Sequence, residues 1–198
     1  MTSEPKADLL GYLRVAREAL VWKLDGASEY DIRRPLTPTG TNLLGLVKHV
    51  SGCEIAYFGD SFGRPFPGRP AWLDLAATDP TIDMWAAPDE SREDITGLYR
   101  AVWAHSDETI EGLPLDAPAR VPHWSAEKAA TTLHRLLVHM IAETHRHAGH
   151  ADIVRELVDG RVGMRAEANN MAEGDEAWWA GYRAKLEQAA KDAGQAGT

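Results

Sequence analysis

The segment HMIAETHRHAGH, residues 139–150, concentrates side chains that bind metal ions, because it holds four of the eight histidines and one glutamate. If the segment is helical, Glu143 and His147 lie one turn apart, about 6 Å from each other. Two ligands at this separation can share one cation, and a carboxylate buried there without a cation or a donor would be costly. The same spacing also suits an ordinary hydrogen bond at the open end of a helix bundle, so both arrangements stay open.

Helical geometry separates the histidines of this segment by direction. At about 100° per residue, the leucine, valine, methionine and alanine side chains of residues 133–158 form one apolar stripe, which marks the direction of the core. His147 falls inside this stripe and Glu143 borders it, whereas His139 and His150 lie at its margin. We therefore expect Glu143 and His147 to point toward the core.

The rest of the chain predicts an all-α fold that could position such a pair. Apolar residues recur at helical spacing in four long segments, and no run of alternating β-branched residues indicates a sheet. A chain of 198 residues suits a single domain, here a four-helix bundle over about residues 5–160, an additional short C-terminal helix and a loose tail. The expected bundle helices cover residues 5–24, 43–62, 89–111 and 125–159, the last capped by Ser125 and ended by Gly160, and the additional helix covers residues 175–191.

The second predicted helix supplies a third candidate ligand. His49 is the only histidine in the first half of the chain, and it lies at the edge of the apolar face of that helix. A lone histidine there is usually a satisfied core residue, but an inward-facing Glu143 and His147 would give it partners. Cys53, one turn later, suits a small core residue, because no basic neighbour in sequence would activate its thiol; a fourth ligand or a reactive thiol are the alternatives.

Composition and charge exclude several other classes of function. The net charge is −9 and the basic residues are scattered, so we expect no nucleic-acid partner. No apolar run approaches the roughly 20 residues of a membrane span, and the N-terminal segment lacks the apolar block of a signal peptide. We therefore expect a cytoplasmic protein without a membrane partner, with helix faces that could support a homodimer.

Three short stretches, LLGLVKHVSGCEIAYF, ETHRHAGHADIVRELVDG and WWAGYRAKLE, make the chain similar to the DinB-like superfamily over nearly its full length. In particular, it resembles an actinobacterial branch related to mycothiol-dependent maleylpyruvate isomerase. The resemblance implies a four-helix bundle with up-down-down-up connectivity and a divalent metal held by three side chains. These match His49, Glu143 and His147, the last two as the Glu-x3-His pair of the isomerase branch. His150 stands where many members carry a glutamine, so it could support a ligand, relay a proton, contact substrate or be an alternate ligand.

Two histidines and one carboxylate leave open positions on a metal, as in catalytic rather than structural sites. These donors suit zinc, and nickel or iron are alternatives. The resemblance also implies a low-molecular-weight thiol such as mycothiol as cosubstrate, whose thiolate a bound cation stabilises. The leading hypothesis is a metal-dependent thiol S-transferase or isomerase acting on an electrophilic substrate, with Arg146 and Trp124 beside the polar and apolar parts of the thiol.

Three other functions stay open at this level. The protein could be a metal-binding, stress-related DinB-like protein without catalysis, or a partner-binding bundle in which the polar triad is a hydrogen-bonded core network. Two histidines and one carboxylate also match the ligand set of non-haem iron oxygenases. Metal content, thiol binding and oxygen consumption separate these hypotheses.

Overall fold

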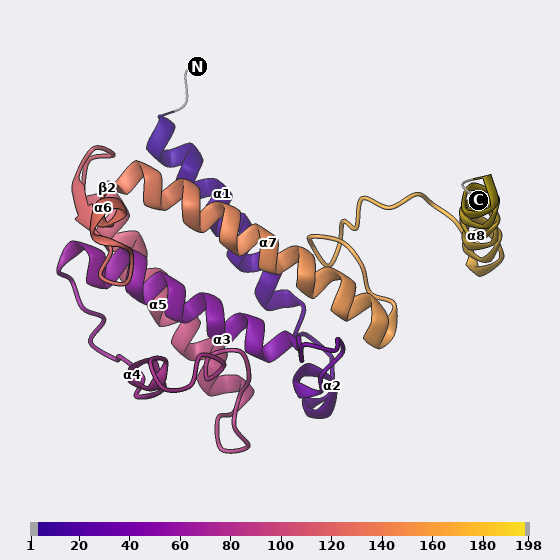
Figure 1. The fold of residues 1–198 in the computed structure, drawn as a ribbon, viewed down its shortest axis with the longest axis horizontal. Helices are drawn as coiled ribbons and strands as arrows, with labels where there is room; N and C mark the ends of the chain where they lie inside the picture. Colours follow the sequence, from indigo (N-terminus) through magenta and orange to yellow (C-terminus); the bar gives the residue numbers. More distant parts are fainter. Residues whose placement is uncertain (1–3, 197–198) are drawn as a thin grey trace.

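Four long helices form a bundle in the computed structural model, which describes residues 4–196 (Figure 1). These helices are α1 (Pro5–Trp22), α3 (Leu43–Glu54), α5 (Arg92–Gly112) and α7 (Leu133–Asp159). In Figure 1, α1 and α7 run in one direction and α3 and α5 in the other, which is the up-down-down-up arrangement. The prediction of an all-α bundle is confirmed.

Polar contacts between helix ends agree with this arrangement. The Lys6 ammonium at the start of α1 donates to the carbonyl oxygens of Glu111 and Leu113 at the end of α5. At the opposite end, the Arg92 guanidinium at the start of α5 donates to the carbonyl oxygen of Leu24, just after α1. The two helices are therefore antiparallel, and each end of one is fastened to the other.

Shorter elements connect the bundle helices. They are α2 (Glu29–Arg33), the π-helical turn η1 (Ile55–Gly59) and the 3-10 turn η2 (Asp60–Phe62) that continue α3, α4 (Trp72–Leu75) and α6 (Ala126–Ala129). Two short strands, β1 (Pro118–Arg120) and β2 (Ala130–Thr132), pair antiparallel. No helix in the described part of the chain is long and apolar enough to cross a membrane.

The main core lies between the four bundle helices and is made by the apolar stripe of each. Burial of one such side chain contributes about 1.5–3 kcal/mol, so the stripes hold every helix in a fixed rotation about its axis. Fully buried members include Leu13 and Leu20 of α1, Val47 and Val50 of α3, Tyr99 and Ile110 of α5, and Leu136 and Met140 of α7.

A buried ion pair joins α1, α3 and α5 beside this core. The Arg17 guanidinium donates to both carboxylate oxygens of Glu54, at 2.8 and 2.6 Å, and to Asp107 at 2.7 Å. The side chains of Arg17 and Glu54 are 1% and 0% exposed. Because an unpaired charge at this depth would be very unfavourable, the pair fixes the rotation of the C-terminal end of α3.

The N-terminal end of α3 is fixed by the long connection that precedes α5. The Asn42 side chain accepts a hydrogen bond from Gly45 N at 2.8 Å and donates to the carbonyl oxygen of Met84 at 3.0 Å. A Cβ atom on Gly45 would lie only 1.9 Å from that same carbonyl oxygen. Only glycine therefore allows the connection to pack so closely on the first turn of α3.

The start of the fourth bundle helix differs from the prediction. Helix α7 begins at Leu133, where the Thr132 hydroxyl caps the backbone N–H of Arg135, and not after Ser125. Residues 126–132 form α6 and β2 instead, because residues 130–132 pair with β1. Strand pairing over a few residues thus overrides the local preference for helix, and the expectation that the chain has no strand is wrong at this point.

The last helix, α8 (Glu176–Ala196), is longer than predicted and stands apart from the bundle at the end of residues 160–175 (Figure 1). Trp178, Tyr182 and Leu186 form an aromatic and apolar stripe along it and are 43–51% exposed. The rings of Trp178 and Tyr182 stack on each other with centroids 5.7 Å apart. The loose tail was expected after residue 191, but the helix continues to Ala196; residues 197–198 lie outside the described residues.

Candidate metal centre

Helices α3 and α7 bring four metal-binding side chains together. His49 and Cys53 lie one turn apart on α3, and Glu143 and His147 lie one turn apart on the antiparallel α7. His49 Nε2 is 3.6 Å from Glu143 Oε1 and 3.6 Å from Cys53 Sγ. His147 Nε2 is 3.0 Å from Glu143 Oε1, and the rings of the two histidines meet edge to face with centroids 4.8 Å apart.

The structure therefore places side by side the three residues that sequence analysis selected, and it adds Cys53. One ligand atom from each of His49, Cys53 and Glu143 lies within 4.8 Å of the other two. Cys53 is only half-buried and packs against the core, as a small core residue would, but its sulfur also faces the donor atoms. The group of three whose ligand atoms lie within 4.8 Å of one another contains Cys53 and not the expected His147. His147 contacts this group through its hydrogen bond with Glu143 and through the edge-to-face contact of its ring with that of His49.

Asp83 completes this cluster from a segment in which sequence analysis selected no residue. Its Oδ2 atom lies 2.8 Å from His49 Nδ1, on the side of the ring away from Cys53. A carboxylate in this position accepts the Nδ1 proton and leaves Nε2 free to bind a metal, as in many carboxylate–histidine–metal sites. Asp83 precedes Met84, which is fastened to the start of α3, so the connection holds the carboxylate beside His49. No local pattern marks Asp83, because its role depends on a contact across 34 positions.

The separations between the donor atoms fit a tetrahedral metal site. Zinc bonds of about 2.0–2.2 Å to nitrogen or oxygen and about 2.3 Å to sulfur place neighbouring donors roughly 3.3–3.6 Å apart. The two distances of 3.6 Å from His49 Nε2 match this range, and the 3.0 Å hydrogen bond between His147 and Glu143 is slightly shorter. These three separations agree with donors that share one cation, and His49, Cys53 and Glu143 form the group whose ligand atoms all lie within 4.8 Å of one another.

The ionisation of the cluster determines which proton a bound metal would have to displace. Burial lowers the pKa of His49, but hydrogen bonds with Asp83 and Cys53 outweigh it and raise the pKa to about 11. Burial raises the pKa of Glu143, but its hydrogen bond with His147 and the nearby positive charges bring it below its usual value. Burial and the charge of His49 lower the pKa of His147. At neutral pH the cluster thus contains an anionic Glu143 and a neutral His147, while a metal must displace one proton from His49.

The remaining predicted residues lie around these donors. His150 Nδ1 is 3.4 Å from His147 Nδ1, so the exposed His150 ring lies on the side of His147 that faces away from Glu143. Arg146 is exposed on α7. Trp124 lies farther along the two helices, where its indole N–H donates to the Tyr57 hydroxyl at 3.3 Å and its ring meets that of His139. Sequence analysis missed Tyr57, although it follows Cys53 by one turn and therefore faces α7.

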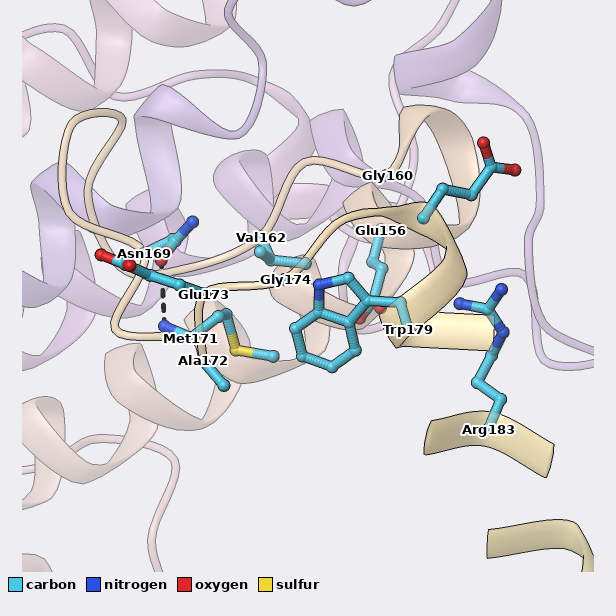
Figure 2. A pocket seen from close by; sticks show the side chains of 11 residues that line it. Glu156, Gly160, Val162, Asn169, Met171, Ala172, Glu173, Gly174, Trp179 and Arg183 are labelled. Atoms are coloured by element: carbon cyan, nitrogen blue, oxygen red, sulfur yellow. Dashed lines mark hydrogen bonds between the residues drawn. The ribbon is translucent and has the colours of Figure 1, made fainter. Parts of the chain in front are cut away.

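A separate pocket of about 540 Å³ lies between the end of α7, the following loop and α8 (Figure 2). Its lining includes Glu156 and Gly160 at the end of α7 and Trp179 and Arg183 of α8. Glu156 follows His147 by nine residues, or about 13 Å along the helix. The pocket is therefore distinct from the metal-binding cluster.

A family model described as mycothiol-S-transferase matches residues 8–160. The chain belongs to this family. The matched region contains α3, α5, α7 and nearly all of α1, together with the four donor side chains and Asp83, whereas α8 lies beyond it. Membership in the mycothiol-S-transferase family agrees with the resemblance to DinB-like proteins. Among proteins with curated descriptions, none matches the chain.

Proposed function

We propose that the protein is a metal-dependent thiol S-transferase or isomerase that uses a mycothiol-like thiol. The observation that carries the proposal is the convergence of His49, Glu143 and His147 from two facing helices, with Asp83 behind His49. Family membership supports a low-molecular-weight thiol as cosubstrate. Zinc suits the two imidazoles and the carboxylate best, and nickel or iron are alternatives.

The chemistry divides between the metal and the protein. A divalent cation bound here would stabilise the thiolate of the cosubstrate, which as a free thiol has a pKa near 8.5 and is mostly protonated at neutral pH. The protein holds the ligands in place, and Asp83 keeps the Nδ1 proton on His49 so that Nε2 faces the site. We assign His150 the orientation of His147, because its Nδ1 lies 3.4 Å from His147 Nδ1, on the side of that ring away from Glu143.

The electrophile and the non-reacting part of the thiol would lie beside the cluster, near Trp124 and Arg146. We place the apolar part of the thiol against Trp124, which Tyr57 holds by a hydrogen bond one turn beyond Cys53. Arg146 is exposed on α7 next to His147 and could attract an anionic or hydroxylated group of the thiol. Trp124→Ala should therefore raise KM for the thiol more than it lowers kcat.

The test begins with elemental analysis of protein purified without chelators or metal-affinity columns. We expect about one equivalent of a divalent metal in the unmodified protein and in the control His134→Ala, which removes an exposed histidine of α7. His49→Ala and His147→Ala should lose it. Retention of stoichiometric metal by His49→Ala would show that the ligand assignment is wrong.

A thiol titration then separates catalysis from binding alone. Addition of mycothiol to the cobalt-substituted protein should change the absorption spectrum, whereas a metal-binding protein without transferase function would ignore the thiol. Iron content with oxygen consumption would indicate an oxygenase instead. Metal-free protein whose melting temperature is unchanged by chelators would indicate a hydrogen-bonded core network.

A further inference from the structure

Cys53 is held in the one orientation that directs its sulfur toward the candidate metal site. The rotation of α3 is fixed at its end by the buried pair of Arg17 with Glu54, the residue after Cys53. It is fixed at its start by the contact of Asn42 with Met84. Because both ends of α3 are fastened, the Cα–Cβ bond of Cys53 keeps its direction toward α7, and in the observed rotamer the sulfur lies beside His49 Nε2.

The position of the sulfur is that of a ligand and not only that of a packed side chain. It lies 3.6 Å from His49 Nε2, close to the roughly 3.5 Å expected between a sulfur and a nitrogen bound to the same zinc ion. Glu143 contributes an oxygen to the same group, in which all ligand atoms lie within 4.8 Å of one another. A cation held by His49 and Glu143 would thus be within reach of Cys53.

We propose that the Cys53 thiolate is the fourth ligand of the metal in the resting protein, and that the thiol cosubstrate displaces it. This inference rests on the proposed function, because it assumes a metal held by His49, Glu143 and His147. It assigns the cysteine a role as an internal thiolate that occupies the coordination position of the substrate thiolate until that thiol arrives. In the resting protein all four coordination positions would be filled, as in a structural site, and the site would become catalytic only when the thiol cosubstrate takes the position of Cys53.

The exchange conserves atoms and charge and needs no oxidant. The bond between the metal and the Cys53 sulfur breaks while a bond to the cosubstrate sulfur forms, and the proton of the incoming thiol passes to Cys53. The bound thiolate then attacks the electrophile. The proton on Cys53 passes to the leaving group or to the carbanion formed by addition, and the Cys53 thiolate replaces the neutral thioether product, which is the weaker ligand.

The closed site predicts that loss of Cys53 has two opposite effects. Removal of one of four ligands should weaken zinc binding by at least about 10- to 100-fold. Loss of a residue that only hydrogen-bonds to a ligand already has an effect of this size. Removal of the internal competitor should lower the dissociation constant for the external thiol at the metal-loaded site. A cysteine that only fills space would not strengthen thiol binding when it is removed.

Cobalt substitution gives a direct readout, because Cys53 is the only cysteine of the chain. Cobalt-loaded protein without added thiol should show a sulfur-to-cobalt charge-transfer band in the near ultraviolet. The band should be absent in Cys53→Ser and Cys53→Ala, while the visible bands of bound cobalt persist. Mycothiol should restore such a band in both variants, and circular dichroism should verify that they are folded.

The outcomes separate this inference from the proposed function. Visible cobalt bands without the charge-transfer band in the unmodified protein would overturn the role of Cys53 and leave the metal site intact. Absence of any bound cobalt would overturn both. If Cys53→Ala does not fold, protection of Cys53 from iodoacetamide by zinc in the unmodified protein, measured by mass spectrometry, decides; alkylation at equal rates with and without zinc would reject the ligand role.

Discussion

Asp83 Oδ2 lies 2.8 Å from Nδ1 of His49, although 34 positions separate the two residues in the chain. This contact fixes the ring orientation of His49 and would keep the proton on Nδ1 once a metal displaces the one on Nε2, which are the two properties a metal ligand needs. It also ties the connection before α5 to the donor cluster. The connection is therefore part of the site and not only a link between helices.

Loss of the Asp83 carboxylate should weaken metal binding without removing a ligand. For Asp83→Asn and Asp83→Ala we expect a roughly 10- to 100-fold lower zinc affinity, because the tautomer and orientation of His49 are no longer enforced. Competition with a chromogenic chelator measures the affinity. Asp89→Asn, at an exposed position of the same connection, is the matched control and should bind zinc like the unmodified protein. Equal affinity in all three variants would refute the supporting role of Asp83.

A side chain on Gly45 should displace the connection and thereby Asp83. The Cβ atom of Gly45→Ala would lie 1.9 Å from the carbonyl oxygen of Met84, so the backbone must move. We expect a loss of about 1–3 kcal/mol in the free energy of unfolding together with weaker zinc binding.

Gly97→Ala is the control for this substitution, because no heavy atom within 4 Å would meet its Cβ. In the middle of α5 it should stabilise the protein by roughly 0.5–1 kcal/mol and leave zinc binding unchanged. Urea unfolding and the chelator competition measure the two quantities. Equal behaviour of Gly45→Ala and Gly97→Ala would contradict the close packing of the connection on α3.

Arg17→Met should be strongly destabilising, because it leaves the fully buried Glu54 without its partner. We expect a decrease of about 3–5 kcal/mol in the free energy of unfolding, measured by urea denaturation of the metal-free protein. The double variant Arg17→Met with Glu54→Leu should recover much of this loss, since no unpaired charge remains. Arg14→Met is the control: Arg14 is half-exposed and its ion pairs should contribute under about 1 kcal/mol.

The Asp159 carboxylate makes stability depend on pH at the end of α7. Hydrogen bonds from Arg155, at 2.9 and 2.7 Å, lower the pKa of Asp159 below its usual value, and burial opposes them. Its stabilising contribution is therefore present above the unfolded-state pKa of about 3.9 and is lost as the pH falls through the lower folded-state pKa. Because the side chain is about one third exposed, we expect a contribution of only about 0.5–1 kcal/mol at pH 7.

Thermal unfolding of Asp159→Asn and of the unmodified protein tests this dependence. The variant should melt at a lower temperature at pH 7, and the difference should shrink as the pH falls through the lowered folded-state pKa of Asp159. A difference that stays the same as the pH falls would show that the charge of Asp159 is not the cause.

Sequence alone determined the features that depend on the local period of the helix. Apolar residues at intervals of three and four predicted which side of each helix is buried, and the same arithmetic placed Glu143 and His147 toward the core and His49 at the edge of its apolar face. Helix ends with strong signals also agree, such as the left-handed Gly160 after α7. These features need no knowledge of distant segments, because each is decided within about two turns of one helix.

Only the tertiary structure decided the features that depend on contacts between distant segments. The approach of Asp83 to His49 requires the packing of the connection on Gly45, and the pairing of β1 with β2 moves the start of α7 from residue 126 to Leu133. The sulfur of Cys53 joins the donors because buried charges on α1 and α5 set the rotation of α3. In each case a contact between residues far apart in the chain outweighs a local conformational preference. Such a contact forms only when the helices pack together, so it cannot be predicted from one segment alone.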